Sequence, residues 1–74
     1  MLLTFAVPGR EYRVVSLMGG RGFNRKLFEM GIKPGSTIRV IINSGRGPIL
    51  IGVNNLRFAL GKGMASKIIV NPIY

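Results

Sequence analysis

The side chains in this sequence that could take part in chemistry are almost all cationic. Its 74 residues include eleven Lys and Arg, no His, no Cys, and two acidic residues, Glu11 and Glu29. General acid–base catalysis needs an imidazole or a pair of tuned carboxylates, and covalent catalysis needs a nucleophile beside a base. The two Glu fall on different predicted elements, so the sequence predicts a protein that is not an enzyme.

The sequence contains equally few residues that could bind a metal ion or a cofactor. Iron, zinc and manganese prefer imidazole, carboxylate or thiolate ligands, and two isolated Glu with four Met cannot surround such an ion. The phosphate-binding pattern Gly-x-x-x-x-Gly-Lys-Ser/Thr does not occur anywhere in the chain. We therefore expect no metal site and no bound cofactor.

A glycine-rich stretch, Gly19-Gly20-Arg21-Gly22, precedes a predicted helix. Backbone amides at the start of a helix can hold an anion, which would make this stretch a phosphate cradle. However, the dinucleotide-binding pattern is not met, because Arg25 stands where its last glycine would be. A strand-to-helix turn that uses positive φ angles is the simpler interpretation.

The positive charge indicates an anionic partner. The formal net charge is +9, and such a surface attracts nucleic acid, acidic proteins or anionic lipids. Arg21, Arg25 and Lys26 cluster at the start of the predicted helix, where the helix dipole disfavours cations. This placement favours a use in binding, although a solvated helix face is the plain alternative.

Nucleic acid is the less favoured of these partners. Proteins that bind single-stranded nucleic acid stack bases on exposed aromatic side chains between basic residues. Tyr12, Phe23 and Phe58 all occupy predicted core positions, so few stacking platforms remain. A small basic barrel that binds nucleic acid through its phosphates stays as the alternative function.

Turn residues divide the chain into short segments that alternate in polarity, as β-strands do. The predicted strands are Tyr12–Leu17, Thr37–Asn43, Ile49–Val53, Leu56–Leu60 and Lys67–Asn71. The residues expected to face inward include Ile38, Val40 and Ile42 in the second strand, Leu56, Phe58 and Leu60 in the fourth, and Ile68 and Val70 in the fifth. Asn54-Asn55 tolerates positive φ and predicts a tight hairpin. The sequence thus predicts a mainly β fold, a closed or nearly closed five-stranded barrel, as a single domain over residues 1–74.

One segment breaks the β pattern. Phe23, Leu27 and Met30 are spaced to form one face of a helix within residues 22–31. Gly31 can end this helix in a left-handed conformation, and Pro34 prevents it from resuming. We expect a short α-helix between strands 1 and 2, with Phe28 off the inner stripe and either widening it or exposed.

The ordered set of motifs along the chain resembles the FeoA family. Gly19-Gly20-Arg21-Gly22 is followed by Lys26-Leu27, then by Glu29-Met30-Gly31-Ile32 and Pro34-Gly35. Leu56-Arg57-Phe58-Ala59-Leu60, Met64-Ala65 and Ile68-x-Val70 are similar to the last hairpin and strand of the same family. The resemblance implies an SH3-like barrel with a helix between its first two strands.

The resemblance also implies a function. It points to a cytoplasmic accessory protein of ferrous iron uptake, whose partner is the cytoplasmic GTP-binding part of a FeoB-type membrane transporter. We expect a peripheral association with the membrane through that partner, since no apolar run approaches the roughly 18 residues of a membrane span. The expected partner-binding residues are Arg21, Arg25, Lys26 and Phe28, and the oligomeric state is left open.

Overall fold

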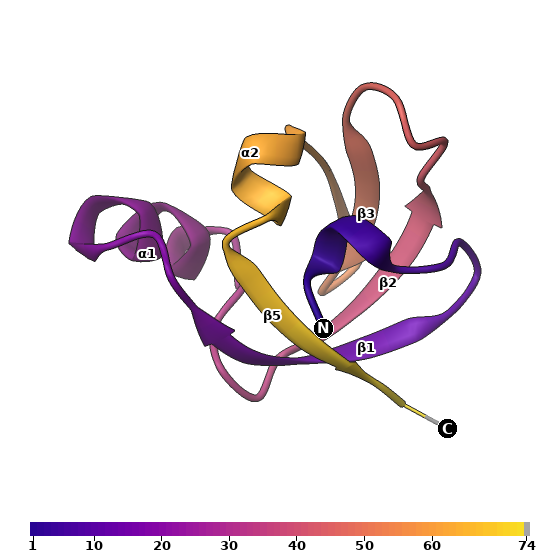
Figure 1. Cartoon of the computed structure of the whole chain (residues 1–74). Coiled ribbons are helices and arrows are strands. Elements are labelled where there is room, and N and C mark those ends of the chain that lie inside the picture. The colour runs from indigo at the N-terminus through magenta and orange to yellow at the C-terminus, as the bar shows by residue number, and fades with distance from the viewer. Residues whose placement is uncertain (74) are drawn as a thin grey trace.

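The computed structural model describes residues 1–73, which form a bent antiparallel sheet with helical segments at its ends (Figure 1). The five strands are β1 (Glu11–Leu17), β2 (Thr37–Ile42), β3 (Ile49–Val53), β4 (Leu56–Leu60) and β5 (Ile68–Pro72). Their order across the sheet is β4-β3-β2-β1-β5, with neighbouring strands antiparallel. The helical segments are η1 (Leu3–Phe5), α1 (Arg21–Glu29) and α2 (Lys62–Ala65). The expected mainly β fold, with a short helix between the first two strands, is confirmed.

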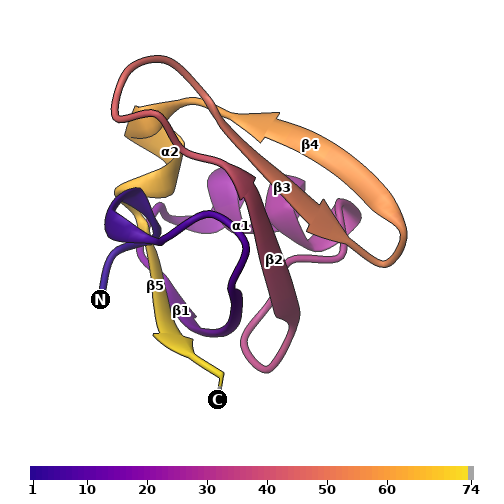
Figure 2. The ribbon, with the colours of Figure 1, turned by 90° about the vertical axis from the view of Figure 1, so that its right-hand side faces the viewer.

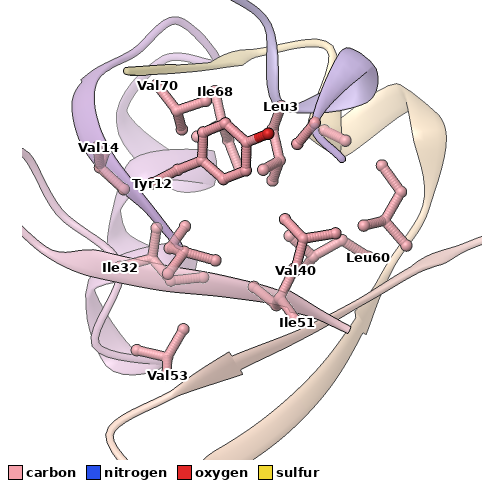
Figure 3. Close-up of a cluster of buried hydrophobic side chains, with 14 of the residues drawn as sticks. Leu3, Tyr12, Val14, Ile32, Val40, Ile51, Val53, Leu60, Ile68 and Val70 are labelled. Atoms are coloured by element: carbon pink, nitrogen blue, oxygen red, sulfur yellow. The ribbon is translucent and has the colours of Figure 1, made fainter. Parts of the chain in front are cut away.

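The sheet curls around one apolar core. Side chains from all five strands meet there, together with residues from η1, α1 and α2 (Figure 3). The core includes Leu3, Ala6, Tyr12, Val14, Leu27, Ile32, Ile38, Val40, Ile49, Ile51, Val53, Leu60, Ala65, Ile68 and Val70. Burial of apolar surface on this scale is the main favourable term for so short a chain.

The N-terminal segment is fastened to the barrel by hydrogen bonds. The Val7 amide donates to the Tyr12 hydroxyl at 2.8 Å, and the Asn43 side-chain amide donates to the carbonyls of Thr4 and Ala6 at 3.0 and 2.9 Å. The Val70 amide donates to the Met1 carbonyl at 2.8 Å, so this segment also covers the outer edge of β5. The 3-10 turn η1 was not expected from the sequence.

The turns form as predicted where their chemistry is specific. Asn54 and Asn55 have φ values of 51° and 66°, which gives the tight hairpin between β3 and β4. α2 was not predicted: Gly61 is the N-cap of a single helical turn, Lys62–Ala65, that buries Ala65. A four-residue helix is too short to produce an amphipathic pattern.

Two expected inward residues face solvent instead. Ile42 is 52% exposed because β2 has an irregular register between Val40 and Ile42, which shifts the alternation by one residue. Leu56 is 58% exposed at the start of β4, an edge strand that no other strand covers within the described residues. Phe23 and Phe58, also expected in the core, are only partly buried and pack against it.

Candidate protein-binding surface

Helix α1 stands to one side of the barrel and is attached to it by one face (Figures 1 and 2). Leu27 is completely buried, and Phe23 and Met30 pack against the core. The Phe23 ring lies directly over Gly19, where an added Cβ would overlap the ring. The Lys67 ammonium lies 5.6 Å from the centre of the same ring, within reach of a cation–π interaction. The inner face of α1 is therefore the predicted apolar stripe.

The C-terminal end of α1 is closed by a Schellman motif. The Ile32 amide donates to the Leu27 carbonyl at 2.8 Å, and the Gly31 amide donates to the Phe28 carbonyl at 3.0 Å. Gly31 has a φ of 87°, as the sequence predicts. The accompanying apolar contact is supplied by Leu27 and Ile32, which are both completely buried. This end of the helix is thus tied firmly to the barrel.

The N-terminal end of α1 lacks comparable support. Gly20 at the N-cap offers no side chain to the free amides, and the first turn contains no acidic residue. Arg21 begins the helix instead, where the helix dipole slightly disfavours a cation. The charge of Arg21 therefore does not stabilise the N-terminal end of α1.

The outer face of α1 carries most of the residues predicted to bind a partner. Arg21, Arg25 and Phe28 line a shallow, open depression on this face, and the Phe28 side chain is 53% exposed. The sequence left open whether Phe28 widens the buried stripe or is exposed, and in the structure it is exposed. Successive residues of an α-helix are rotated by about 100°, so residues 21, 25 and 28 share one side.

Lys26 is exposed but stands apart from this group. It follows Arg25 in the helix and so points about 100° away from it, toward one flank of α1. It does not line the depression. The structure therefore brings three of the four expected residues together and places the fourth at their margin.

Two residues of this surface were not identified from the sequence. Asn24 and Glu29 complete the lining of the depression. Glu29 lies one turn after Arg25, a spacing that could have revealed it. Within residues 1–73, the charged groups of Arg21, Arg25 and Glu29 form no ion pair or hydrogen bond. The buried Oδ1 atom of Asn24 also has no hydrogen-bond partner there. The surface is accordingly mixed in charge, with an exposed aromatic ring.

The structure does not gather metal-ligating groups. Glu11 lies in β1 and Glu29 at the end of α1, and residues 1–73 contain no cluster of three His, Cys, Asp or Glu side chains that could hold a metal ion. The donor set of this chain does not fit a transition-metal site. In the same part of the chain, no helix is both long and apolar enough to cross a membrane.

Comparison with known proteins identifies the family. The model of the FeoA domain matches residues 1–72. The chain is 40% identical, over 68 residues, to the "Putative Fe(2+) transport protein A" of Methanocaldococcus jannaschii, covering 92% of this chain and 82% of that protein.

Solved structures agree in fold. The crystal structure of an iron uptake regulatory protein, FeoA, has a TM-score of 0.92 and 40% sequence identity, over 99% of this chain and 97% of that one. The zinc-complexed FeoA of Stenotrophomonas maltophilia, described as a prokaryotic SH3 domain protein, has a TM-score of 0.83 and 26% identity, over 96% and 89% of the two chains. The chain therefore belongs to the FeoA family of ferrous iron transport proteins, with an SH3-like fold.

Proposed function

We propose that this protein is a cytoplasmic accessory protein that docks on the cytoplasmic GTP-binding part of a FeoB-type ferrous iron transporter and modulates iron uptake. It acts by binding, without catalysis of its own, and reaches the membrane through its partner. Family membership supports the role in ferrous iron transport. The lack of His, of Cys and of clustered acids supports action through shape and charge.

The contact surface in this proposal is the outer face of α1. One observation carries the assignment: Arg21, Arg25 and Phe28 lie together and exposed, while the opposite face of the helix is held by the core. Exposed aromatic and arginine side chains are the residue types that contribute most to protein–protein affinity. Lys26, at the margin, adds positive charge that speeds the encounter.

The test compares two charge reversals of equal size. The full-length transporter in detergent is titrated with wild-type protein, with Arg25→Glu and with Lys26→Glu, and both association and dissociation are followed. We expect Arg25→Glu to weaken binding by about tenfold or more, chiefly through faster dissociation. Lys26→Glu, at the rim, is expected to slow association with a smaller loss of affinity, and more so at low salt.

Thermal unfolding of both variants provides the control for folding, because exposed substitutions should leave it unchanged. GTP turnover by the transporter, measured with and without each variant, reports on modulation. Equal affinity of the Arg25→Glu variant and the wild type at low salt would overturn the assignment of α1. Absence of binding by the wild-type protein would overturn the proposed partner.

A further inference from the structure

A second surface lies on the outer side of the sheet, where Gly52 leaves a gap in the middle of β3. Figure 2 shows β3 between β2 and β4, and the register pairs Gly52 with Arg39 of β2 and with Arg57 of β4. Ile51 and Val53, the neighbours of Gly52, are buried in the core, so position 52 faces outward. Gly52 thus forms the floor of a groove with an arginine on either side.

The fold does not require glycine at this position. Gly52 has no positive φ, and a Cβ there would meet only the Ile41 Cδ1 atom at 3.5 Å and the Leu56 carbonyl oxygen at 3.9 Å, which are ordinary contacts. Glycine inside a strand weakens it, and commonly marks a place where a ligand or another backbone approaches closely. Since neither backbone strain nor crowding explains Gly52, the open space above it is what distinguishes the position.

The two arginines beside this floor have no partner in the described part of the chain. Neither the Arg39 nor the Arg57 guanidinium forms an ion pair or hydrogen bond among residues 1–73. Glu11 also lines the groove and faces Arg39 across β1 and β2 without binding it, so the two arginines leave the groove with a net positive charge. Adjacent strands are about 4.8 Å apart, so a chain lying along β3 would have a guanidinium on each side. A carboxylate above Gly52 could then accept bidentate hydrogen bonds from either arginine.

The remaining lining favours a peptide over a nucleic acid. Ile41 adds apolar surface to the groove, and among residues 1–73 no aromatic side chain lines it. Within this part of the chain bases would find no stacking platform, whereas an acidic residue next to an aliphatic one matches both features. Asn54 and Asn55 at the hairpin turn close one end of the groove with amide groups.

We propose that the groove over Gly52, flanked by Arg39 and Arg57 and bordered by Ile41, binds an extended acidic peptide segment of a partner protein. This surface is separate from the outer face of α1, with which it shares no lining residue. The protein would then have two binding surfaces, and one of them recognises a carboxylate between two guanidiniums.

The experiment uses the full chain and a random peptide library displayed on phage. Selected peptides are expected to contain Asp or Glu beside Leu, Ile or Val, and a labelled copy of one is titrated by fluorescence anisotropy. The double variant Arg39→Ala/Arg57→Ala should bind it about tenfold or more weakly. Gly52→Val, which fills the floor, should lose binding to a similar extent while its melting temperature stays equal or rises.

The matched control is Arg21→Ala/Arg25→Ala, which removes the same charge from α1 and should bind the peptide like the wild type. These two double variants also separate this proposal from the α1 assignment. Arg39→Ala/Arg57→Ala should weaken binding to the peptide only, and Arg21→Ala/Arg25→Ala should weaken binding to the transporter only. Selection without enrichment of acids, or equal binding by the Arg39→Ala/Arg57→Ala variant, would overturn the inference. A labelled single-stranded RNA that binds the wild type and is lost from that variant would do so too, because it would identify a phosphodiester as the occupant.

Discussion

The two faces of α1 differ in what determines their residues. The inner face places Leu27 in the core with no exposed surface, and Phe23 and Met30 pack beside it. The outer face, with Arg21, Arg25 and Phe28, is exposed, and none of these three residues belongs to the core cluster. One short helix therefore contains residues explained by the stability of the fold and exposed residues that we propose to bind a partner.

Because one face of α1 is buried and the other is exposed, substitutions in this one helix can test stability and binding separately. Substitutions on the inner face should lower the free energy of unfolding and affect binding only because the protein unfolds. Substitutions on the outer face should affect binding and leave unfolding unchanged. Each of the following predictions checks one side of this division.

The largest effect is expected for Leu27→Ala. Removing a completely buried leucine leaves a cavity and lowers the free energy of unfolding by about 2–5 kcal/mol. For so small a domain this is a large share of the total stability. Urea denaturation monitored by circular dichroism measures the loss, and Leu27→Met, which nearly conserves volume, should cost less than about 1.5 kcal/mol. A loss below about 1 kcal/mol for Leu27→Ala would show that α1 is not part of the core.

An intermediate effect is expected at the junction of α1 with the barrel. Gly31→Ala places a Cβ at a φ of 87°, which costs about 1–2 kcal/mol. The new Cβ would also lie 2.6 Å from the Asn54 Nδ2 atom and 3.4 Å from Val53 Cγ1, so the hairpin side chains must shift.

Gly35→Ala is the matched control, since Gly35 has a φ of 94° with nothing within 4 Å of an added Cβ. Chemical denaturation should therefore show a larger loss for Gly31→Ala than for Gly35→Ala. Equal losses would mean that the close approach of α1 to the hairpin contributes nothing to stability.

The fold could be predicted from the sequence where one local cause dominates. Alternating apolar residues located the strands, Asn54-Asn55 located a hairpin, and the spacing of Phe23, Leu27 and Met30 located α1. The failures share a different origin. Ile42 faces solvent because of an irregular strand register, and this depends on how β2 pairs with β3. Such an irregularity has no signature in β2 alone.

The candidate surface could be predicted only in part, for a related reason. Helical spacing is enough to group Arg21, Arg25 and Phe28, and the same spacing sets Lys26 apart from them. The groove over Gly52 has only part of a local signal: the Asn54-Asn55 hairpin pairs Gly52 with Arg57, but the pairing of Gly52 with Arg39 depends on the register of β2 against β3. Surfaces built by a sheet need the register before they can be recognised.

The smallest effect on stability, and the sharpest test of the comparison, is expected for Phe28→Ala. The ring is 53% exposed and lies outside the core, so the free energy of unfolding should change by no more than about 0.5 kcal/mol. Alanine is also the better helix former, which offsets any small loss of contact. Urea denaturation compares this variant with Leu27→Ala, its neighbour in the chain, whose side chain points about 100° away into the core.

If Phe28→Ala weakens binding to the transporter and leaves unfolding unchanged, the outer face of α1 is an interaction surface. If the same substitution lowers the free energy of unfolding by more than about 1 kcal/mol, the ring is a structural residue and the division between the faces fails. The two outcomes differ in the free energy of unfolding of the Phe28→Ala variant, which is measured without any partner. A phenylalanine whose removal weakens binding and leaves unfolding unchanged contributes to the interface and not to the fold.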